Sequence, residues 1–224
     1  MLIYSVSFVI VMKKMGYICK MIVKLYDNAP NPKDVAEVVE CLNRGGVVIV
    51  PTDTIYSIVC KMSNRKGFDA LCRIKGLTIK SSDFSILCPS LSNLSNYTRP
   101  IPNQLFRLLK RNLPGPFTFI LEANNAIPKL FGTRRKTIGV RVPDNSIFQA
   151  IAEHLDEPLI GTSIHDDDEI IEYTTDPSLI YEKYSHQIDL MVDGGYGNNT
   201  PSTVVDCVEM PPVIVRQGIG ELKE

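Results

Sequence analysis

Hydroxyl and cationic side chains recur where apolar, strand-like segments of the sequence begin or end. Thr52 and Thr54 come directly after one such segment, and Arg141 lies in another, shortly before Pro143. In open α/β sheets, ligands bind at strand ends, where loop amides and side chains converge. Arg and Lys together with Ser and Thr donors suit a phosphate or a carboxylate. The residues of this pattern are Thr52, Thr54, Lys75, Arg141, Thr162, Ser163, Ser202, Thr203 and Arg216.

Each of these residues also has an ordinary structural explanation, because Ser, Thr, Lys and Arg are common in caps and turns. For any single residue, that explanation is the better one. Taken together, the set favours a pocket for an anionic small molecule.

Other motifs that would define a site are absent or stand in the wrong context. The chain has no GxxxxGK[ST] phosphate loop. The run 194–197, GGYG, leads to Pro201 and a further strand instead of a helix, which argues against a dinucleotide site. His165 precedes four acidic residues, 166–169, which could join a divalent cation site. A solvated acidic loop or helix start is the favoured explanation, so we predict no metal site.

Hydrophobic periodicity predicts the helices and strands that would position these side chains. In the segment 31–45, Asn31 can cap a helix, Pro32 suits its first turn and Gly45 follows its last turn. Further helices are predicted at 66–75, 103–112, 146–155 and 177–184. Strands are predicted at 22–26, 47–50, 84–88, 117–122, 137–142, 158–163, 189–193, 202–207 and 213–216.

The mixed order of these elements predicts one α/β domain with a large, twisted, mixed open sheet flanked by helices. Residues 21–224 contain no linker or internal repeat, so they are expected to form this single domain. Residues 1–20 are interpreted as an N-terminal extension, and as a candidate misassigned start, because Met21 opens a natural first strand. The apolar run 2–12 is followed by two lysines, the wrong charge order for a secretory signal.

Composition and charge narrow the class of protein. The 224 residues are 44% hydrophobic and 22% charged, which excludes a disordered, collagenous or multi-span membrane chain. The formal net charge of −1 hides an uneven distribution. Residues 61–141 hold 15 Lys and Arg against 3 Asp and Glu, whereas residues 142–224 hold 3 against 17. This distribution indicates either an anionic partner or internal pairing of the two halves.

Cysteine use and hydropathy indicate the compartment. The six cysteines form no CxxC pair, and several lie in apolar runs, which is typical of free, buried thiols in a reducing cytoplasm. No stretch approaches the ~20 apolar residues that a membrane span needs. A cytoplasmic protein without a membrane partner is therefore expected.

Five ordered segments resemble the motifs of the YrdC-like family, which includes the threonylcarbamoyl-AMP synthases. These segments are GGVVIVPTDTIYSI at 45–58, LPGPFTFIL at 113–121, TIGVRVPD at 137–144, PSTVVD at 201–206 and IVRQG at 214–218. The resemblance covers residues 22–220, nearly the whole chain. It is strongest to the YciO branch, which shares the RKTIGVRVPD and TFIL forms.

The resemblance implies a YrdC/RibB-like open sheet with a concave, positively charged face, and the family is associated with RNA binding. Its synthases join L-threonine, bicarbonate and ATP into threonylcarbamoyl-AMP, releasing pyrophosphate, for modification of an adenosine in tRNA. ATP with Mg²⁺ is the implied cofactor. The substrate- or nucleotide-binding residues that the resemblance implies are Thr52, Thr54, Tyr56, Lys75, Arg141, Ser163, Ser202, Thr203 and Arg216.

Four positions depart from the family motifs. Leu77 stands where an arginine is expected, and His165 stands where an asparagine is expected. Ser57 replaces a glycine, and Gln217 replaces a proline. Loss of a bidentate Arg is costly where it leaves an anion unpaired. The departures favour a protein that keeps the fold and the anion pocket without full synthase activity.

The leading hypothesis is a cytoplasmic YciO-type protein that binds double-stranded RNA or tRNA through a basic concave face and holds an anionic small molecule or nucleotide in its pocket. The alternative is an adenylate-forming enzyme of the threonylcarbamoyl-AMP synthase type. A third hypothesis is a regulatory nucleotide-binding domain without chemistry. The expected RNA-binding residues are Arg107, Lys110, Arg111, Arg134, Arg135 and Lys136.

Overall fold

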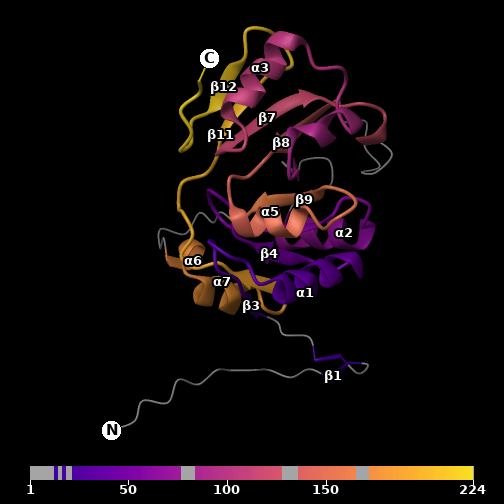
Figure 1. Cartoon of the computed structure of the whole chain (residues 1–224), viewed down its shortest axis with the longest axis vertical. Coiled ribbons are helices and arrows are strands. Elements are labelled where there is room, and N and C mark those ends of the chain that lie inside the picture. Colours follow the sequence, from indigo (N-terminus) through magenta and orange to yellow (C-terminus); the bar gives the residue numbers. More distant parts are fainter. Residues whose placement is uncertain are drawn as a thin grey trace.

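Apolar segments separated by polar turns form the strands of one large sheet (Figure 1). The computed structural model describes residues 13–14, 17–18, 22–76, 84–127, 136–164 and 172–223. The strands of this sheet are β3 (Ile22–Lys24), β4 (Val48–Val50), β5 (Ser57–Lys61), β6 (Ser85–Leu87), β7 (Phe117–Glu122), β8 (Thr137–Arg141), β9 (Leu159–Ser163), β10 (Leu190–Asp193), β11 (Thr203–Asp206) and β12 (Val213–Arg216). The helices are α1 (Pro32–Asn43), α2 (Arg65–Ile74), α3 (Asn103–Asn112), α5 (Ser146–Ala152), α6 (Glu172–Thr175) and α7 (Pro177–Tyr184), with a 3-10 turn at Leu91–Asn96.

The ten strands lie in the order β12-β11-β7-β8-β6-β9-β5-β4-β10-β3. Four neighbouring pairs are parallel, namely β3–β10, β4–β10, β6–β8 and β7–β11. The remaining neighbours pair antiparallel. The prediction of a single α/β domain around a mixed sheet is therefore confirmed.

The two faces of the sheet contribute to two separate cores. One core contains Phe119 and Val140, and α3 packs against it with Leu109. The other core joins α1 and α5 to strand residues such as Val48 and Val59. That second core draws on β3, β4, β5, β6, β9 and β10 but on no described residue of β7, β8, β11 or β12. At the β12 end, therefore, one face of the sheet is left uncovered by α1 and α5.

Several predicted boundaries agree with the structure, because capping and turn residues mark them. The bounds of α3, β7, α7 and β12 are those predicted. In α1, the Asn31 side chain accepts from the Lys33 N–H, and Gly45 has a φ of 91° just beyond the helix. The strand β5 was not among the predicted strands. It lies between β4 and β9 with four of its five residues buried, so it lacks the alternation that marks a half-buried strand.

The first twenty residues, predicted to be an extension, are described only in part. Lys13–Lys14 (β1) and Tyr17–Ile18 (β2) pair with each other and do not join the large sheet. Within the described ranges, no helix is long and apolar enough to cross a membrane. The free cysteines of the same ranges are all buried, as predicted: Cys41, Cys60, Cys72, Cys88 and Cys207.

Candidate functional site

A cavity of about 480 Å³ lies on the sheet face that α1 and α5 leave uncovered. Thr118 of β7 and Arg141 of β8 line it, whereas their strand neighbours Phe119 and Val140 belong to the core beneath α3. Alternate residues of a strand point to opposite faces, so the cavity and α3 occupy opposite sides of these strands. The volume falls within the range of ligand pockets, about 300–1,000 Å³.

Arg141, the last residue of β8, is a buried cation whose side chain is 4% exposed. Its Nη2 group donates to Asp53 Oδ1 at 2.8 Å and to Thr54 Oγ1 at 2.9 Å. The Thr54 N–H donates to Thr52 Oγ1 at 3.1 Å, and the Thr52 hydroxyl donates to the Ile55 carbonyl at 2.8 Å. The loop between β4 and β5 therefore holds this guanidinium with residues that do not themselves line the cavity.

The Asp53–Arg141 pair is incompletely satisfied. In the part of the chain that the structure describes, Asp53 Oδ2 and Arg141 Nε are buried without a hydrogen-bond partner. Burial raises the pKa of the Asp53 carboxyl, and the nearby Arg141 opposes that effect. Burial likewise lowers the pKa of the Arg141 guanidinium, which Asp53 raises and Arg216 lowers further. An arginine stays protonated under these conditions, so the cavity is lined by a permanent positive charge.

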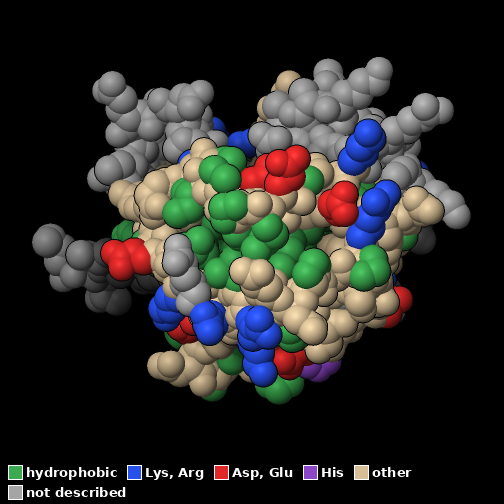
Figure 2. Space-filling model, turned by 90° about the horizontal axis from the view of Figure 1, so that it is seen from above, with side chains coloured by type: hydrophobic (Ala, Val, Ile, Leu, Met, Phe, Trp, Pro, Cys, Tyr) green, Lys and Arg blue, Asp and Glu red, His purple; other side chains and the backbone are tan. Residues whose placement is uncertain are grey.

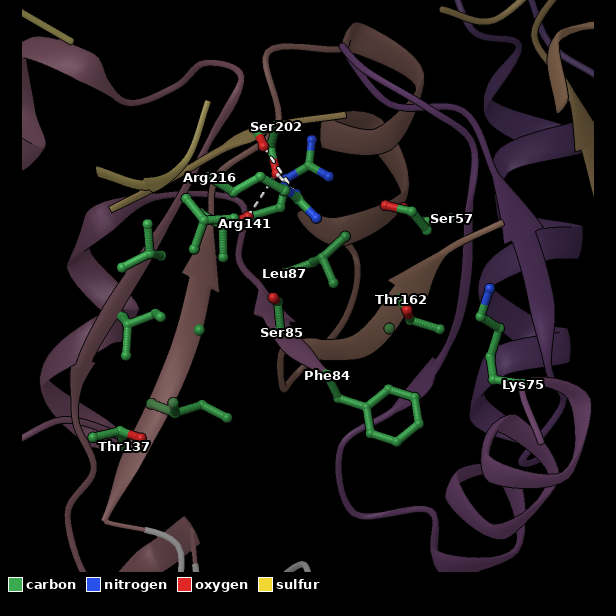
Figure 3. A pocket seen from close by; sticks show the side chains of 18 residues that line it. Ser57, Lys75, Phe84, Ser85, Leu87, Thr137, Arg141, Thr162, Ser202 and Arg216 are labelled. Carbon is green, nitrogen blue, oxygen red and sulfur yellow. Dashed lines mark hydrogen bonds between the residues drawn. The ribbon is translucent and has the colours of Figure 1, made fainter. Parts of the chain in front are cut away.

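Arg216 of β12 brings a second guanidinium to the same end of the cavity (Figure 3). Its Nη2 group donates to the Ser202 carbonyl at 2.9 Å and lies 3.4 Å from Ser202 Oγ. The Ser202 hydroxyl lies 2.8 Å from the Thr118 hydroxyl on the neighbouring strand. Two guanidinium groups and two hydroxyls thus meet at one point, an arrangement suited to a phosphate or carboxylate.

Lys75 and two serines complete the lining of the cavity. Lys75 directly follows α2 and lies across from Arg141 and Arg216 in Figure 3. Ser57, at the start of β5, pairs with Ser163 at the end of β9. Cations on two sides with hydroxyl donors between them suit a ligand that carries more than one anionic group.

Four of the nine predicted binding residues lie outside the cavity lining. Thr52 and Thr54 reach it only through Arg141, as described above. Tyr56 is 1% exposed, and its hydroxyl donates to the Gly195 carbonyl at 2.7 Å. Thr203 is fully buried, and its hydroxyl donates to the Gly220 carbonyl at 2.7 Å. In the structure, the hydroxyls of Tyr56 and Thr203 therefore each connect to the backbone of a distant segment of the chain. The five that line the cavity are Lys75, Arg141, Ser163, Ser202 and Arg216.

The expected RNA-binding residues that the structure describes are Arg107, Lys110 and Arg111 of α3 and Lys136, just before β8. Because α3 buries Leu105 and Leu109 in the core, its cations Arg107, Lys110 and Arg111 are exposed and lie away from the cavity. Figure 2 views the molecule from the end where α3 and β12 lie in Figure 1, and there the Lys and Arg side chains form separate groups with apolar side chains between them. The described side chains on this face therefore form no continuous basic surface.

Several predicted positions fall outside the described residues: Leu77, Arg134, Arg135, His165 and the acidic run 166–169. Lys136 is described and exposed, just before β8. Over the described ranges, no group of three or more His, Cys, Asp or Glu side chains could hold a metal ion.

Asp53 and Ser57 belong to the site and were absent from the predicted binding residues. Asp53 stands between the two threonines of the loop, directly after a buried strand, and its contact with Arg141 joins residues 88 positions apart. Ser57 was noted only as a departure from a motif. The sequence alone does not indicate which residue a carboxylate such as Asp53 contacts, because that partner depends on the order of the strands in the sheet.

Comparisons with known proteins agree with this arrangement. The family model Sua5_yciO_yrdC, described as "Telomere recombination", matches residues 40–218. The chain is 38% identical over 201 residues to the uncharacterized protein YciO of Escherichia coli K12, covering 89% of the chain and 96% of YciO. It is 30% identical over 158 residues to human threonylcarbamoyl-AMP synthase, covering 69% of the chain and 53% of that enzyme.

Two solved structures have the same fold. The crystal structure of E. coli YciO matches with a TM-score of 0.82, covering 90% of this chain and 97% of that one. The crystal structure of Pyrococcus abyssi Sua5 complexed with L-threonine matches with a TM-score of 0.78 at 24% identity, covering 89% of this chain and 58% of that one.

Proposed function

Because the chain belongs to the Sua5/YciO/YrdC family, we propose that it binds RNA and holds a phosphate-bearing ligand in the cavity of Arg141 and Arg216. The observation that carries this proposal is the convergence of these two guanidinium groups with Lys75 on one cavity. The hydroxyls of Ser163 and Ser202 add neutral donors to the same cavity. Such a donor set is typical of nucleotide and phosphate sites.

The RNA partner is supported by the family and by the basic segment 61–141. In this proposal, the exposed cations Arg107, Lys110 and Arg111 of α3 contact backbone phosphates, together with Lys136. The proposal also includes Arg134 and Arg135, which lie outside the described residues. The buried free thiols support a reducing compartment, the cytoplasm.

The test is fluorescence anisotropy with a labelled RNA duplex and with tRNA at two salt concentrations. Contact with three or more phosphates should weaken binding by at least about tenfold between roughly 50 and 200 mM salt. The double variant Arg107→Ala/Arg111→Ala should weaken binding to both RNAs, with Arg44→Ala, directly after α1, as the control. Affinity that is equal at the two salt concentrations would refute RNA binding through phosphates.

The runner-up is a threonylcarbamoyl-AMP synthase activity, supported by the 30% identity to the human synthase and by the composition of the cavity. Here ATP with Mg²⁺ would be the cofactor, and Lys75, Arg141 and Arg216 would hold its phosphates. The test is incubation with ATP, Mg²⁺, threonine and bicarbonate, with pyrophosphate measured against a Lys75→Ala control. Release of pyrophosphate that does not depend on threonine would exclude the synthase. Saturable ATP binding without turnover would favour a regulatory nucleotide-binding domain.

A further inference from the structure

The hydrogen bonds of Arg141 hold its guanidinium through one nitrogen, Nη2. Both hydrogen bonds to Asp53 and Thr54 come from Nη2. The Nε–H group is buried and has no partner in the described part of the chain. Arg141 lines the cavity, while Asp53 and Thr54 do not. The side chain is thus fixed by two residues that lie outside the cavity lining, while Arg141 itself faces the cavity.

We propose that Asp53 is a positioning residue of this anion site, which together with Thr54 fixes Arg141 so that its guanidinium faces an anion bound in the cavity. The inference rests on the proposed function, in which the cavity holds a phosphate-bearing ligand. Arg216 makes this role necessary, because its guanidinium lies close enough to repel that of Arg141. A fixed donor loses less side-chain freedom when the anion binds, and so binds it more tightly.

Asp53 acts on an anion in two opposite ways. Its negative charge repels the ligand, whereas its hydrogen bond to Arg141 favours ligand binding because it fixes the position of the guanidinium. Substitution by Asn removes the charge and keeps an oxygen that can accept from Nη2. Substitution by Ala removes both. Because Oδ2 has no hydrogen-bond partner among the described residues, an amide NH₂ group in its place would break no hydrogen bond.

Isothermal titration with inorganic pyrophosphate separates the two effects. Asp53→Asn should bind as tightly as the wild type, or up to several-fold more tightly. Asp53→Ala should bind about tenfold more weakly despite the loss of negative charge, and Thr54→Val about threefold more weakly. Asp156→Asn, which removes a carboxylate outside the cavity lining, is the charge-matched control. If Asp53→Ala binds more tightly, as Asp53→Asn does, Asp53 is only a counter-ion and the inference is wrong.

A second measurement does not depend on the ligand. In NMR spectra of the free protein, the Nε–H signal of Arg141 should be resolved in the wild type and in Asp53→Asn, and lost to exchange in Asp53→Ala. If the wild type binds no pyrophosphate while this pattern holds, the proposed ligand is wrong and the positioning role stands. If the signal survives in Asp53→Ala, the positioning role is wrong whatever binds. Should Asp53→Ala fail to fold, Asp53→Ser and Thr54→Val provide the same comparison.

Discussion

Ser57 and Ser163 are cross-strand partners in the antiparallel pair β5–β9, and both line the cavity. Directly opposite residues of an antiparallel pair have Cβ atoms about 4.5–5.5 Å apart. The two serines are therefore spaced to contact one ligand group together. Ser57 lies between the two arginines and Lys75 in Figure 3.

We expect Ser57→Ala and Ser163→Ala each to weaken pyrophosphate binding by about three- to tenfold, because each removes one hydrogen-bond donor to a charged ligand. The double variant should lose less than the product of the two, since the residues share a ligand group. Isothermal titration measures all three, with the exposed Ser95→Ala as the control. Unchanged affinity in both single variants would exclude the serines from the binding surface.

Tyr56→Phe should destabilise the fold without affecting the ligand. The Tyr56 hydroxyl donates to the Gly195 carbonyl at 2.7 Å and accepts from the Gly194 N–H at 3.0 Å, and it is buried. Its removal leaves both backbone groups unpaired, which costs about 1–3 kcal/mol of unfolding free energy. Urea denaturation measures this loss, and titration with pyrophosphate should give a wild-type affinity. A variant of wild-type stability with weakened binding would instead assign Tyr56 to the ligand.

The ion pair of Lys61 and Asp156 predicts a pH-dependent contribution to stability. The Lys61 ammonium donates to the Asp156 carboxylate at 2.6 Å, and this hydrogen bond holds the pKa of Asp156 below its ordinary 3.8. A lowered pKa in the folded state adds stability above the unfolded value, and this stability is lost as the pH falls through the folded value. Asp156→Asn should therefore lower the Tm slightly at about pH 6 and by less at about pH 2.5.

Thermal unfolding across that pH range checks this, with Glu153→Gln as a control carboxylate that makes no ion pair within the described residues. A difference in Tm of the same size at both pH values would show that Asp156 acts through its shape and not through its charge.

The buried thiols should resist alkylation. Burial raises the pKa of Cys88 to about 12 and also raises that of Cys60. At pH 8 such a thiol is ionised in roughly one molecule in ten thousand, and the thiolate is the reactive species. Iodoacetamide should label the peptides of Cys60 and Cys88 at least about a hundredfold faster in urea than in buffer, as measured by mass spectrometry. Rapid labelling in buffer would mean that this part of the sheet opens readily.

The sequence predicted local structure well where a boundary has its own chemical mark. Helix α3 has the predicted bounds because a proline precedes it and its leucine stripe is regular. The central strand β5 has no such mark, since burial on both faces removes the alternation of apolar and polar residues. The parallel pairing of β7 with β11 brings Thr118 to Ser202 across 84 positions. No local pattern encodes that distance, so the residues that line the cavity could be predicted only in part.

The same limit applies to two predicted binding residues that lie outside the cavity lining. Tyr56 and Thr203 stand near strand ends, where a ligand or a loop can equally use a hydroxyl. The sequence shows that a hydroxyl is present. Only the fold shows that it donates to the carbonyl of Gly195 or of Gly220. Asp53 is the converse case, since its importance follows entirely from the residue that the fold places beside it.

The lining of the cavity is drawn from positions as far apart as Ser57 and Arg216. No segment shorter than residues 57–216 contains the whole lining. A ligand of the cavity therefore binds only to the folded protein, and its binding is linked to global unfolding. At a hundredfold excess over its Kd, a ligand adds about 2.7 kcal/mol to the free energy of unfolding. For a protein of this size that raises the Tm by about 5–11 °C. A thermal-shift comparison of pyrophosphate, ATP, threonine and short RNA would therefore reveal the ligand class before any reaction is known.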